Sequence, residues 1–275
     1  MNARLAEMYP TAFVTGASTG LGRAFAEMLL AEGVSVWGTA RDPARLAELA
    51  KNQSFTPVTL ELRDGPAAEK VFLEAGRAAG GFALVVNNAG YGVLGEFAET
   101  DFAIWEEQLG VMLINTARLA HAALQGMRAR NRGALVNISS LAAEFPLPFQ
   151  SAYNMTKAGL TALSESLMIE TAGTGVVVID FRPGDYRTDF EGAVRRPPGP
   201  ASPALGRAWA AFQRMMETGP APVHAAAALR HALLGRRSGT VRCGRFFQAK
   251  LAPLLVRFGS LPLKRRVQAK YFDLE

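Results

Sequence analysis

The sequence predicts an α/β fold in which helices flank a parallel β-sheet. Through the first two-thirds of the 275 residues, short runs rich in β-branched and aromatic residues alternate with longer stretches of helical periodicity. The strand-like runs are almost wholly apolar, as expected for strands that are covered on both faces. Because 49% of the chain is hydrophobic, it can bury one sizeable core, and we expect a single domain over residues 1–275.

Six strands are predicted, each as a short apolar run bounded by turn residues. They are 11–16 (TAFVTG), 34–39 (VSVWGT), 55–62 (FTPVTLEL), 82–88 (FALVVNN), 133–140 (GALVNISS) and 175–184 (GVVVIDFRPG). Helical periodicity marks the stretches at 22–33, 43–52, 67–80, about 100–130 and 151–173. Strands and helices thus alternate, as parallel strands joined by crossover helices require.

Two later segments have a different character. Residues 184–222 contain RRPPGPASP and few strand signals, so we expect a long substrate loop, or lid, with a short amphipathic helix around 209–216. Residues 245–275 predict a C-terminal helical extension that packs over the substrate pocket or a subunit, or else lies on an acidic bilayer. We favour the packed helix. The residues concerned are Phe246, Phe247, Leu254, Leu255, Val256 and Phe258, interleaved with Arg257, Lys264, Arg265 and Arg266.

The composition limits the compartment and the partners. The single cysteine, Cys243, cannot form an internal disulfide, and we expect a small buried residue in a reducing compartment. We find no leader pattern and no apolar run long enough to cross a bilayer, and therefore expect a cytoplasmic protein. The net charge of +6 suits an anionic partner such as a phosphorylated cofactor. No zinc spacing or aromatic-basic pattern indicates a metal or nucleic acid.

A glycine-rich loop follows the first predicted strand and opens the first predicted helix. VTGASTGLG has its glycines at a G-x-x-x-G-x-G spacing. Glycines at such a turn let the backbone approach a pyrophosphate, whose charge the helix N-terminus favours. The alternative is a strand-to-helix turn without a ligand. We predict that a dinucleotide lies along Gly16, Ser18, Thr19, Gly20, Leu21 and Gly22.

The residues after the second predicted strand indicate which dinucleotide binds. Sites for NAD usually present an acidic side chain here, which binds the ribose hydroxyls. This sequence reads GTARDP, with Ala40 at that place and Arg41 beside it. Since a small residue leaves room for a 2′-phosphate and a guanidinium pairs with it, we predict NADP(H). The alternative is that Arg41 is a solvated residue before the next helix.

Tyr153 and Lys157 lie four residues apart in a predicted helix and therefore share one face. Alone this is weak evidence, because chance gives such a pair in about one chain in ten. A phenol is a poor base at neutral pH, but a nearby ammonium group favours the phenolate. Such a phenol can exchange a proton with a carbonyl oxygen while hydride reaches the carbon. Ser140, at the end of its strand, can stabilise the charge on that oxygen.

Five motifs resemble, in order and spacing, those of the short-chain dehydrogenases/reductases: TGASTGLG, NNAG, VNISS, YNMTK and PGDYRTDF. Ser140 precedes Tyr153 by thirteen residues, as the catalytic serine does in that family. Over residues 10–240, the resemblance implies a doubly wound Rossmann-type sheet and catalysis by Ser140, Tyr153 and Lys157. It also implies a homodimer or homotetramer. The TAR sequence and the basic tail resemble the NADP-dependent hydroxysteroid/retinol-dehydrogenase-like branch.

The resemblance assigns further residues to the cofactor. Tyr153 and Lys157 would contact it, and Lys157 would hold the nicotinamide ribose. Thr188 would bind the carboxamide, with an ordinary helix cap as its alternative role. Leu62 would line the adenine pocket, together with Glu61. The other implied positions are Asn87, Ala89 and Gly90 on the adenosine side, where Asn87 also stabilises the sheet, and Pro183 and Gly184 beside the nicotinamide.

One position departs from the family pattern. Many members have an asparagine in the helix before the serine strand, which anchors a water that leads to the lysine. Met112 stands at that position, 28 residues before Ser140. A thioether cannot hold the water as an amide does, although Asn115 could take over one turn later. A sensor or scaffold that binds cofactor without turnover is therefore the alternative to an enzyme.

Aromatic and apolar residues around the expected nicotinamide mouth predict the substrate class. With no arginine clamp for a small acid, they suit a bulky ketone or secondary alcohol that is steroid-, retinoid- or lipid-like. The alternative is that many of them are core residues. They are Tyr91, Phe145, Pro146, Phe149, Phe190 and the helix at 209–216. We predict an NADP(H)-dependent oxidoreductase that transfers a hydride between nicotinamide and such a substrate.

Overall fold

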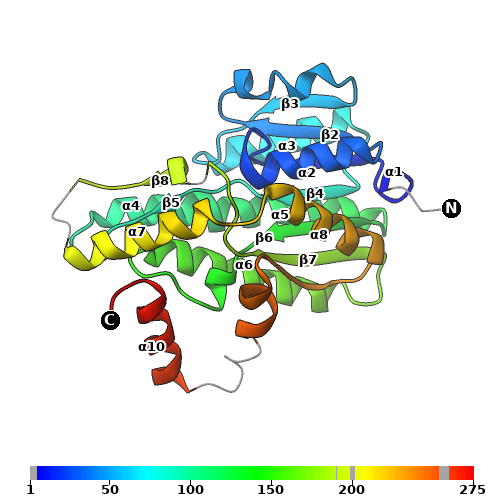
Figure 1. The fold of residues 1–275 in the computed structure, drawn as a ribbon. Helices are drawn as coiled ribbons and strands as arrows, with labels where there is room; N and C mark the ends of the chain where they lie inside the picture. Colours follow the sequence, from blue (N-terminus) through cyan, green and yellow to red (C-terminus); the bar gives the residue numbers. More distant parts are fainter. Residues whose placement is uncertain (1–4, 190, 199–201, 254–259) are drawn as a thin grey trace.

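The computed structural model describes residues 5–189, 191–198, 202–253 and 260–275. Its described strands form a seven-stranded parallel sheet in the order β3-β2-β1-β4-β6-β7-β9 (Figure 1). They are β1 (Thr11–Val14), β2 (Ser35–Ala40), β3 (Phe55–Thr59), β4 (Leu84–Asn87), β6 (Gly133–Ile138), β7 (Val176–Pro183) and β9 (Gly239–Cys243). The chain builds outward from β1 to β3, then returns to add β4 on the other side of β1. The predicted doubly wound α/β fold is therefore confirmed.

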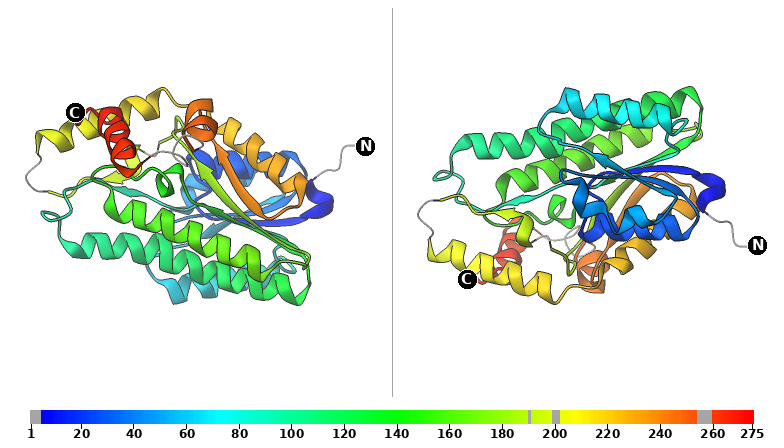
Figure 2. Two further views of the ribbon diagram at one scale, coloured as in Figure 1. Left: turned by 90° about the horizontal axis from the view of Figure 1, so that it is seen from below. Right: turned by 90° about the horizontal axis from the view of Figure 1, so that it is seen from above.

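Helices cover both faces of the sheet, as the two views in Figure 2 show. They are α2 (Gly20–Ala31) and α8 (Pro222–Gly235) on one face, and α3 (Gly65–Ala78), α5 (Asn115–Ala129) and α6 (Ser151–Glu170) on the other. Successive side chains of a strand point to opposite faces. Accordingly, Val14 belongs to the apolar cluster of α2 and α8, while Phe13 belongs to that of α3, α5 and α6. The apolar strands are buried for this reason.

Several predicted elements differ from those observed. The stretch 43–52 forms two 3₁₀ turns, η1 (Pro43–Leu46) and η2 (Leu49–Lys51), and not a continuous helix, because Pro43 and Asp42 favour a capped turn. The long helix at 100–130 consists of α4 (Phe102–Leu109), a π-helical turn η3 (Gly110–Ile114) and α5. In the expected loop, α7 (Pro203–Glu217) is longer than predicted. Both α8 and β9 were missed.

Shorter elements lie around this frame. They are α1 (Leu5–Met8), η4 (Leu141–Ala143), η5 (Glu191–Ala193) and a small parallel pair of β5 (Gly92–Val93) and β8 (Val194–Arg195). The pairing of β5 with β8 fastens the segment after β7 to the segment after β4. The predicted lid thus carries both a strand and a helix.

The C-terminal extension contains η6 (Phe247–Leu251) and α10 (Leu261–Tyr271), which lie at the bottom of Figure 1. Gln268 Nε2 donates to the Pro146 carbonyl at 2.9 Å, and Arg207 Nε of α7 donates to the Asp273 carbonyl at 2.8 Å. The extension is thus packed against the substrate side, yet Leu263 and Val267 of α10 are more than half exposed. Outside the described residues lie Leu254, Leu255, Val256, Arg257 and Phe258.

Two expectations from the composition concern membrane-spanning helices and the environment of Cys243. In the described part of the chain, we find no helix with the length and apolar character that crossing a bilayer requires. Cys243 is buried at the end of β9, and this burial raises the pKa of its thiol to about 11. The thiolate is therefore disfavoured at neutral pH, which agrees with the expected small buried residue.

Candidate active site

A cavity of about 880 Å³ lies at the carboxyl ends of the sheet strands, where the strand order reverses. This is the place where open parallel sheets bind ligands. The structure brings most predicted site residues together in its wall. They are Gly16, Ser18, Thr19, Gly20, Leu21, Arg41, Leu62, Ala89, Gly90, Ser140, Tyr153, Lys157, Pro183, Gly184 and Thr188. Gly22 and Asn87 do not line it.

The glycine loop has the shape that a dinucleotide requires. Gly16 and Gly20 have φ values of +67° and +56°, which side chains other than glycine rarely adopt. A Cβ atom on Gly22 would lie 2.1 Å from the Gly16 carbonyl oxygen. Gly22 therefore allows α2 to pack against the loop. It does not line the cavity, and its cofactor contact stays a prediction. Glycines before and within the first turn of α2 leave space beside the helix N-terminus, and a pyrophosphate fits there.

The two asparagines after β4 have separate roles. Asn87 Nδ2 donates to Asn137 Oδ1 at 2.9 Å, and Asn137 Nδ2 donates to Ser164 Oγ at 3.0 Å. Asn87 thus ties the sheet to α6, in agreement with its expected role in stabilising the sheet, and its cofactor contact stays a prediction. Asn88, which sequence reasoning missed, lines the cavity, and its Nδ2 donates to the Thr15 carbonyl at 3.0 Å. Asn88 therefore holds the glycine loop in place.

Positive charge collects at the end of β2. Ala40 stands where an NAD site would place an acidic side chain. Arg41 and Arg45 both line the cavity beside it. Within the described residues, neither guanidinium has an ion pair. The carboxylate of Asp42 accepts a hydrogen bond from the Ala44 amide at 3.0 Å and caps η1. The two arginines are therefore available to an anionic group.

Ser140, Tyr153 and Lys157 meet beside the end of β6. Ser140 Oγ accepts from the Ala142 amide at 3.0 Å and is hydrogen-bonded to the Tyr153 phenol. Lys157, one turn after Tyr153 on α6, donates from Nζ to the Ile138 carbonyl at 2.8 Å. Its Nζ lies 5.5 Å from the centre of the Tyr153 ring. The three side chains thus form one buried polar group, as the motifs predict.

The electrostatics of this group differ from the expectation. Burial raises the pKa of Tyr153 to about 12; the Ser140 hydrogen bond lowers it and the charge of Asp185 raises it further. Burial likewise lowers the pKa of Lys157 to about 8, against the attraction of Asp180. The chain alone therefore does not make the phenol acidic, because desolvation raises the pKa of Tyr153 more than the Ser140 hydrogen bond lowers it. Tyr153 is held as a neutral proton donor.

Met112 lies buried in the π-helical turn η3, between the site and the core. The Tyr91 amide donates to its Sδ at 3.4 Å, and Gln108 Nε2 approaches the same sulfur at 3.7 Å. Asn115 Nδ2 donates to the Leu62 carbonyl at 2.7 Å, beside the predicted adenine pocket. Asn115 therefore does not take over the relay position, because its amide is already used to hold that pocket.

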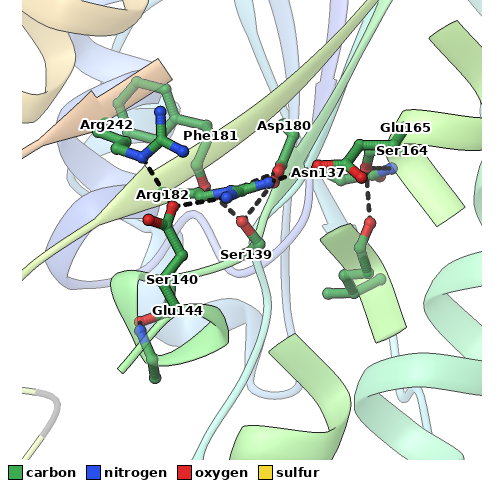
Figure 3. Close-up of polar contacts among 12 residues, drawn as sticks. Asn137, Ser139, Ser140, Glu144, Ser164, Glu165, Asp180, Phe181, Arg182 and Arg242 are labelled. Carbon is green, nitrogen blue, oxygen red and sulfur yellow. Dashed lines mark hydrogen bonds and ion pairs between the residues drawn. The ribbon is translucent and has the colours of Figure 1, made fainter. Parts of the chain in front are cut away.

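A network of charged residues lies behind the serine loop (Figure 3). Arg182 of β7 is 4% exposed and contacts three carboxylates. Its Nε lies 2.6 Å from Asp180 Oδ2, its Nη1 lies 2.5 Å from Glu144 Oε1 and its Nη2 lies 2.9 Å from Glu165 Oε1. Ser139 Oγ donates to Asp180.

This network joins the elements that carry the site. Glu144 follows η4, the turn that Ser140 caps, and Glu165 lies on α6, the helix of Tyr153 and Lys157. Because Arg182 binds both carboxylates, it fixes the loop of the serine relative to that helix. Sequence reasoning missed Arg182, although an acid and a base two residues apart in an apolar strand share one face and can pair.

The predicted substrate wall is present in part. Tyr91 and Phe145 line the cavity, and so do Phe212 and Met216 of α7. Pro146 and Phe149 do not line it, and the predicted residue Phe190 lies outside the described residues. The remaining apolar lining residues on the side of Ser140 are Leu141, Ala142 and Leu147. The apolar wall is thus smaller than expected, and the charged residues Asp185, Asp189 and Arg195 line the same cavity.

Comparisons with known proteins identify the family with which this chain shares its sequence and fold. Residues 10–198 match the family model described as short chain dehydrogenase. A short chain dehydrogenase of Pseudocercospora fijiensis is 33% identical over 66% of this chain and 60% of its own length. A probable NADP-dependent dehydrogenase of Haemophilus influenzae is 33% identical over 63% of this chain and 70% of its own.

The fold extends over nearly the whole of one solved structure. A short-chain dehydrogenase from Streptomyces avermitilis has a TM-score of 0.82 and 31% identity, and the match covers 98% of this chain and 97% of that one. The match to the family model includes the glycine loop, Ser140, Tyr153 and Lys157. The chain therefore belongs to the short-chain dehydrogenase family of oxidoreductases, whose members bind nicotinamide cofactors.

Proposed function

We propose that this protein is an NADP(H)-dependent reductase of ketones with an apolar body. The observation that carries the proposal is the neutral, buried phenol of Tyr153, hydrogen-bonded to Ser140 in the same cavity as the glycine loop. A carbonyl reductase needs a proton donor at the substrate oxygen, and a phenol whose pKa is about 12 holds its proton at neutral pH.

Each residue of the group has a part in this chemistry. The nicotinamide, when bound, supplies the hydride to the carbonyl carbon. The Tyr153 hydroxyl gives its proton to the carbonyl oxygen, while the Ser140 hydroxyl donates a hydrogen bond to the same oxygen and stabilises its developing charge. Lys157, with a pKa near 8, holds a positive charge that favours the tyrosinate left behind. Its Nζ can also bind the hydroxyls of the nicotinamide ribose.

Arg41 and Arg45 support the choice of NADP(H) over NAD(H). Both line the cavity beside Ala40, where an NAD site would place an acid. We expect Arg41→Ala to weaken NADPH binding by about 1–3 kcal/mol, the cost of losing a charged hydrogen bond. NADH binding should change little, because NADH lacks the 2′-phosphate. Titration of each cofactor by fluorescence measures both, and equal losses would contradict the assignment.

The apolar lining supports a substrate with an apolar body, as in the steroid-, retinoid- or lipid-like class. Consumption of NADPH with a panel of such ketones, and with small keto acids as the matched comparison, tests this. Turnover confined to the apolar ketones is the expected result. If NADPH binds but no ketone is reduced, the alternative of a cofactor-binding scaffold is favoured, in line with Met112 at the relay position.

Self-association into a homodimer or homotetramer is part of the proposal. Ile114 in η3 is 58% exposed, and Met155 and Ile169, four helical turns apart on α6, are 44% and 79% exposed. Apolar side chains on neighbouring long helices favour contact with a second copy. Light scattering of the purified protein should give a mass of two or four chains, and Ile169→Glu should lower it.

A further inference from the structure

The carboxylate of Asp185 shares the cavity with the catalytic group. It directly follows Pro183 and Gly184 at the end of β7 and lines the same cavity as Tyr153. Its negative charge also raises the pKa of the Tyr153 phenol. Apolar side chains form the wall near them: Leu141, Phe145, Leu147, Phe212 and Met216. A substrate carbonyl at Tyr153 would therefore have both an apolar wall and a carboxylate beside it.

The partners of Asp185 within the described chain do not neutralise it. Gln248 Nε2, a neutral amide from η6, lies 2.5 Å from Asp185 Oδ2 and donates to it. The positive charge that acts on Asp185 is that of Arg245, through space, and the Arg245 guanidinium donates to the Thr218 carbonyl. No described residue bonds to Oδ1, which leaves this oxygen for a ligand.

A cation beside Asp185 would stabilise the ionised form of this carboxyl group. Burial raises the pKa of Asp185, while the Gln248 hydrogen bond and the Arg245 charge lower it. Buried charges in proteins are as a rule paired, and a cation beside a carboxylate stabilises its ionised form. Since none of the described residues places a cation against Asp185, a cationic ligand would supply the missing partner.

We propose that Asp185 binds an ammonium group of the substrate, so that the site takes amino ketones or amino alcohols that carry an apolar body. This proposal deepens the proposed function and rests on it. The apolar wall holds the body, Tyr153 and Ser140 bind the reacting oxygen, and Asp185 selects the substrates with an ammonium group near that oxygen. Asp185 is thus a specificity-determining residue.

Asp185 also has a structural contact that the test must separate from this role. Gln248 Nε2 bonds to both Asp185 and the Tyr271 hydroxyl, the latter at 2.7 Å, and so links β7 to η6 and α10. Asp185→Asn keeps an acceptor oxygen for Gln248 and removes the charge. Gln248→Leu removes the link and keeps the charge. The two variants therefore distinguish binding of an ammonium group from anchoring of the C-terminal segment.

The experiment titrates two alcohols calorimetrically into protein saturated with NADPH, with which an alcohol cannot react. One is phenylethanolamine, and the other is the same alcohol with a methyl group in place of the ammonium group. The wild type should bind phenylethanolamine at least about tenfold more tightly, as a charged hydrogen bond implies. Asp185→Asn should abolish this preference, and Gln248→Leu should keep it.

Two results would overturn the proposal. One is equal affinity of the wild type for both alcohols, which needs no variant to fold. The other is a preference that survives in Asp185→Asn. If NADPH itself did not bind when the protein is loaded with it, this would count against the proposed function instead, and the two alcohols would then be titrated into the protein alone.

Discussion

Lys157 should destabilise the cofactor-free protein at neutral pH, and its replacement by methionine measures the effect. Lys157 is 5% exposed, and burial lowers the pKa of its ammonium group from 10.5 to about 8. A shift of one unit corresponds to about 1.36 kcal/mol, so the difference between folded and unfolded chains amounts to about 3 kcal/mol. Methionine fills a similar volume and cannot be charged.

The sign of the pH dependence follows from linkage. Below about pH 8 the lysine is charged in both states, and the folded state carries the full desolvation cost. Between about pH 8 and pH 10.5 the folded protein loses the proton before the unfolded chain does, so wild-type stability rises with pH. Tyr153 is present in both proteins, and its raised pKa lowers the stability of both only above about pH 10.

The assay is urea unfolding of wild type and Lys157→Met at a series of pH values, without cofactor. The stability of the wild type relative to the variant should rise by about 2–3 kcal/mol between about pH 7 and pH 10. Lys51→Met, which removes an exposed lysine, controls for general alkaline effects. A relative stability that stays constant across this range would refute the buried, desolvated lysine.

Two further predictions concern other parts of the chain. Arg182→Met should destabilise the protein by about 3–5 kcal/mol in urea unfolding, because the fully buried charge of Asp180 loses its ion-pair partner. Arg23→Met, which breaks an exposed pair, should cost less than about 1 kcal/mol, and equal costs would contradict the role of the network. Residues 245–275 carry seven Lys and Arg against two Asp and Glu, so the protein should sediment with phosphatidylserine vesicles and not with phosphatidylcholine vesicles. Leu263→Glu should weaken this binding, and an unchanged affinity would exclude α10 from the contact.

The fold was predictable where the apolar periodicity was strong. The strands β1, β2, β3, β4, β6 and β7 lie in the six predicted runs, so their type followed from composition. In contrast, β9 (GTVRC) contains glycine and arginine and resembles a loop; it lies at the edge of the sheet, and four of its five residues are only half-buried. The segment 43–52 has helical periodicity but forms two 3₁₀ turns, which shows that local capping decided the outcome.

The residues of the site could be predicted from the sequence, whereas the pKa values of their side chains could not. Spacing and motifs identified Ser140, Tyr153 and Lys157, since side-chain type and helical period are visible in the sequence. Burial is not visible there, so the pKa of the phenol was expected to fall and instead rises. The sequence does not distinguish the adjacent Asn87 and Asn88. The pleat of β4 decides that the side chain of Asn87 bonds to Asn137 of the neighbouring strand, whereas that of Asn88 bonds to the glycine loop.

The proton donor is the central claim, and Tyr153→Phe tests it most directly. With NADPH and a ketone that the wild type reduces, the rate should fall by about 10²–10⁴-fold, the usual contribution of a general acid. NADPH affinity should stay close to that of the wild type. Tyr9→Phe removes a phenol that lies outside the cavity and donates to the Leu233 carbonyl, and serves as the control. A rate that Tyr153→Phe leaves unchanged would contradict the account.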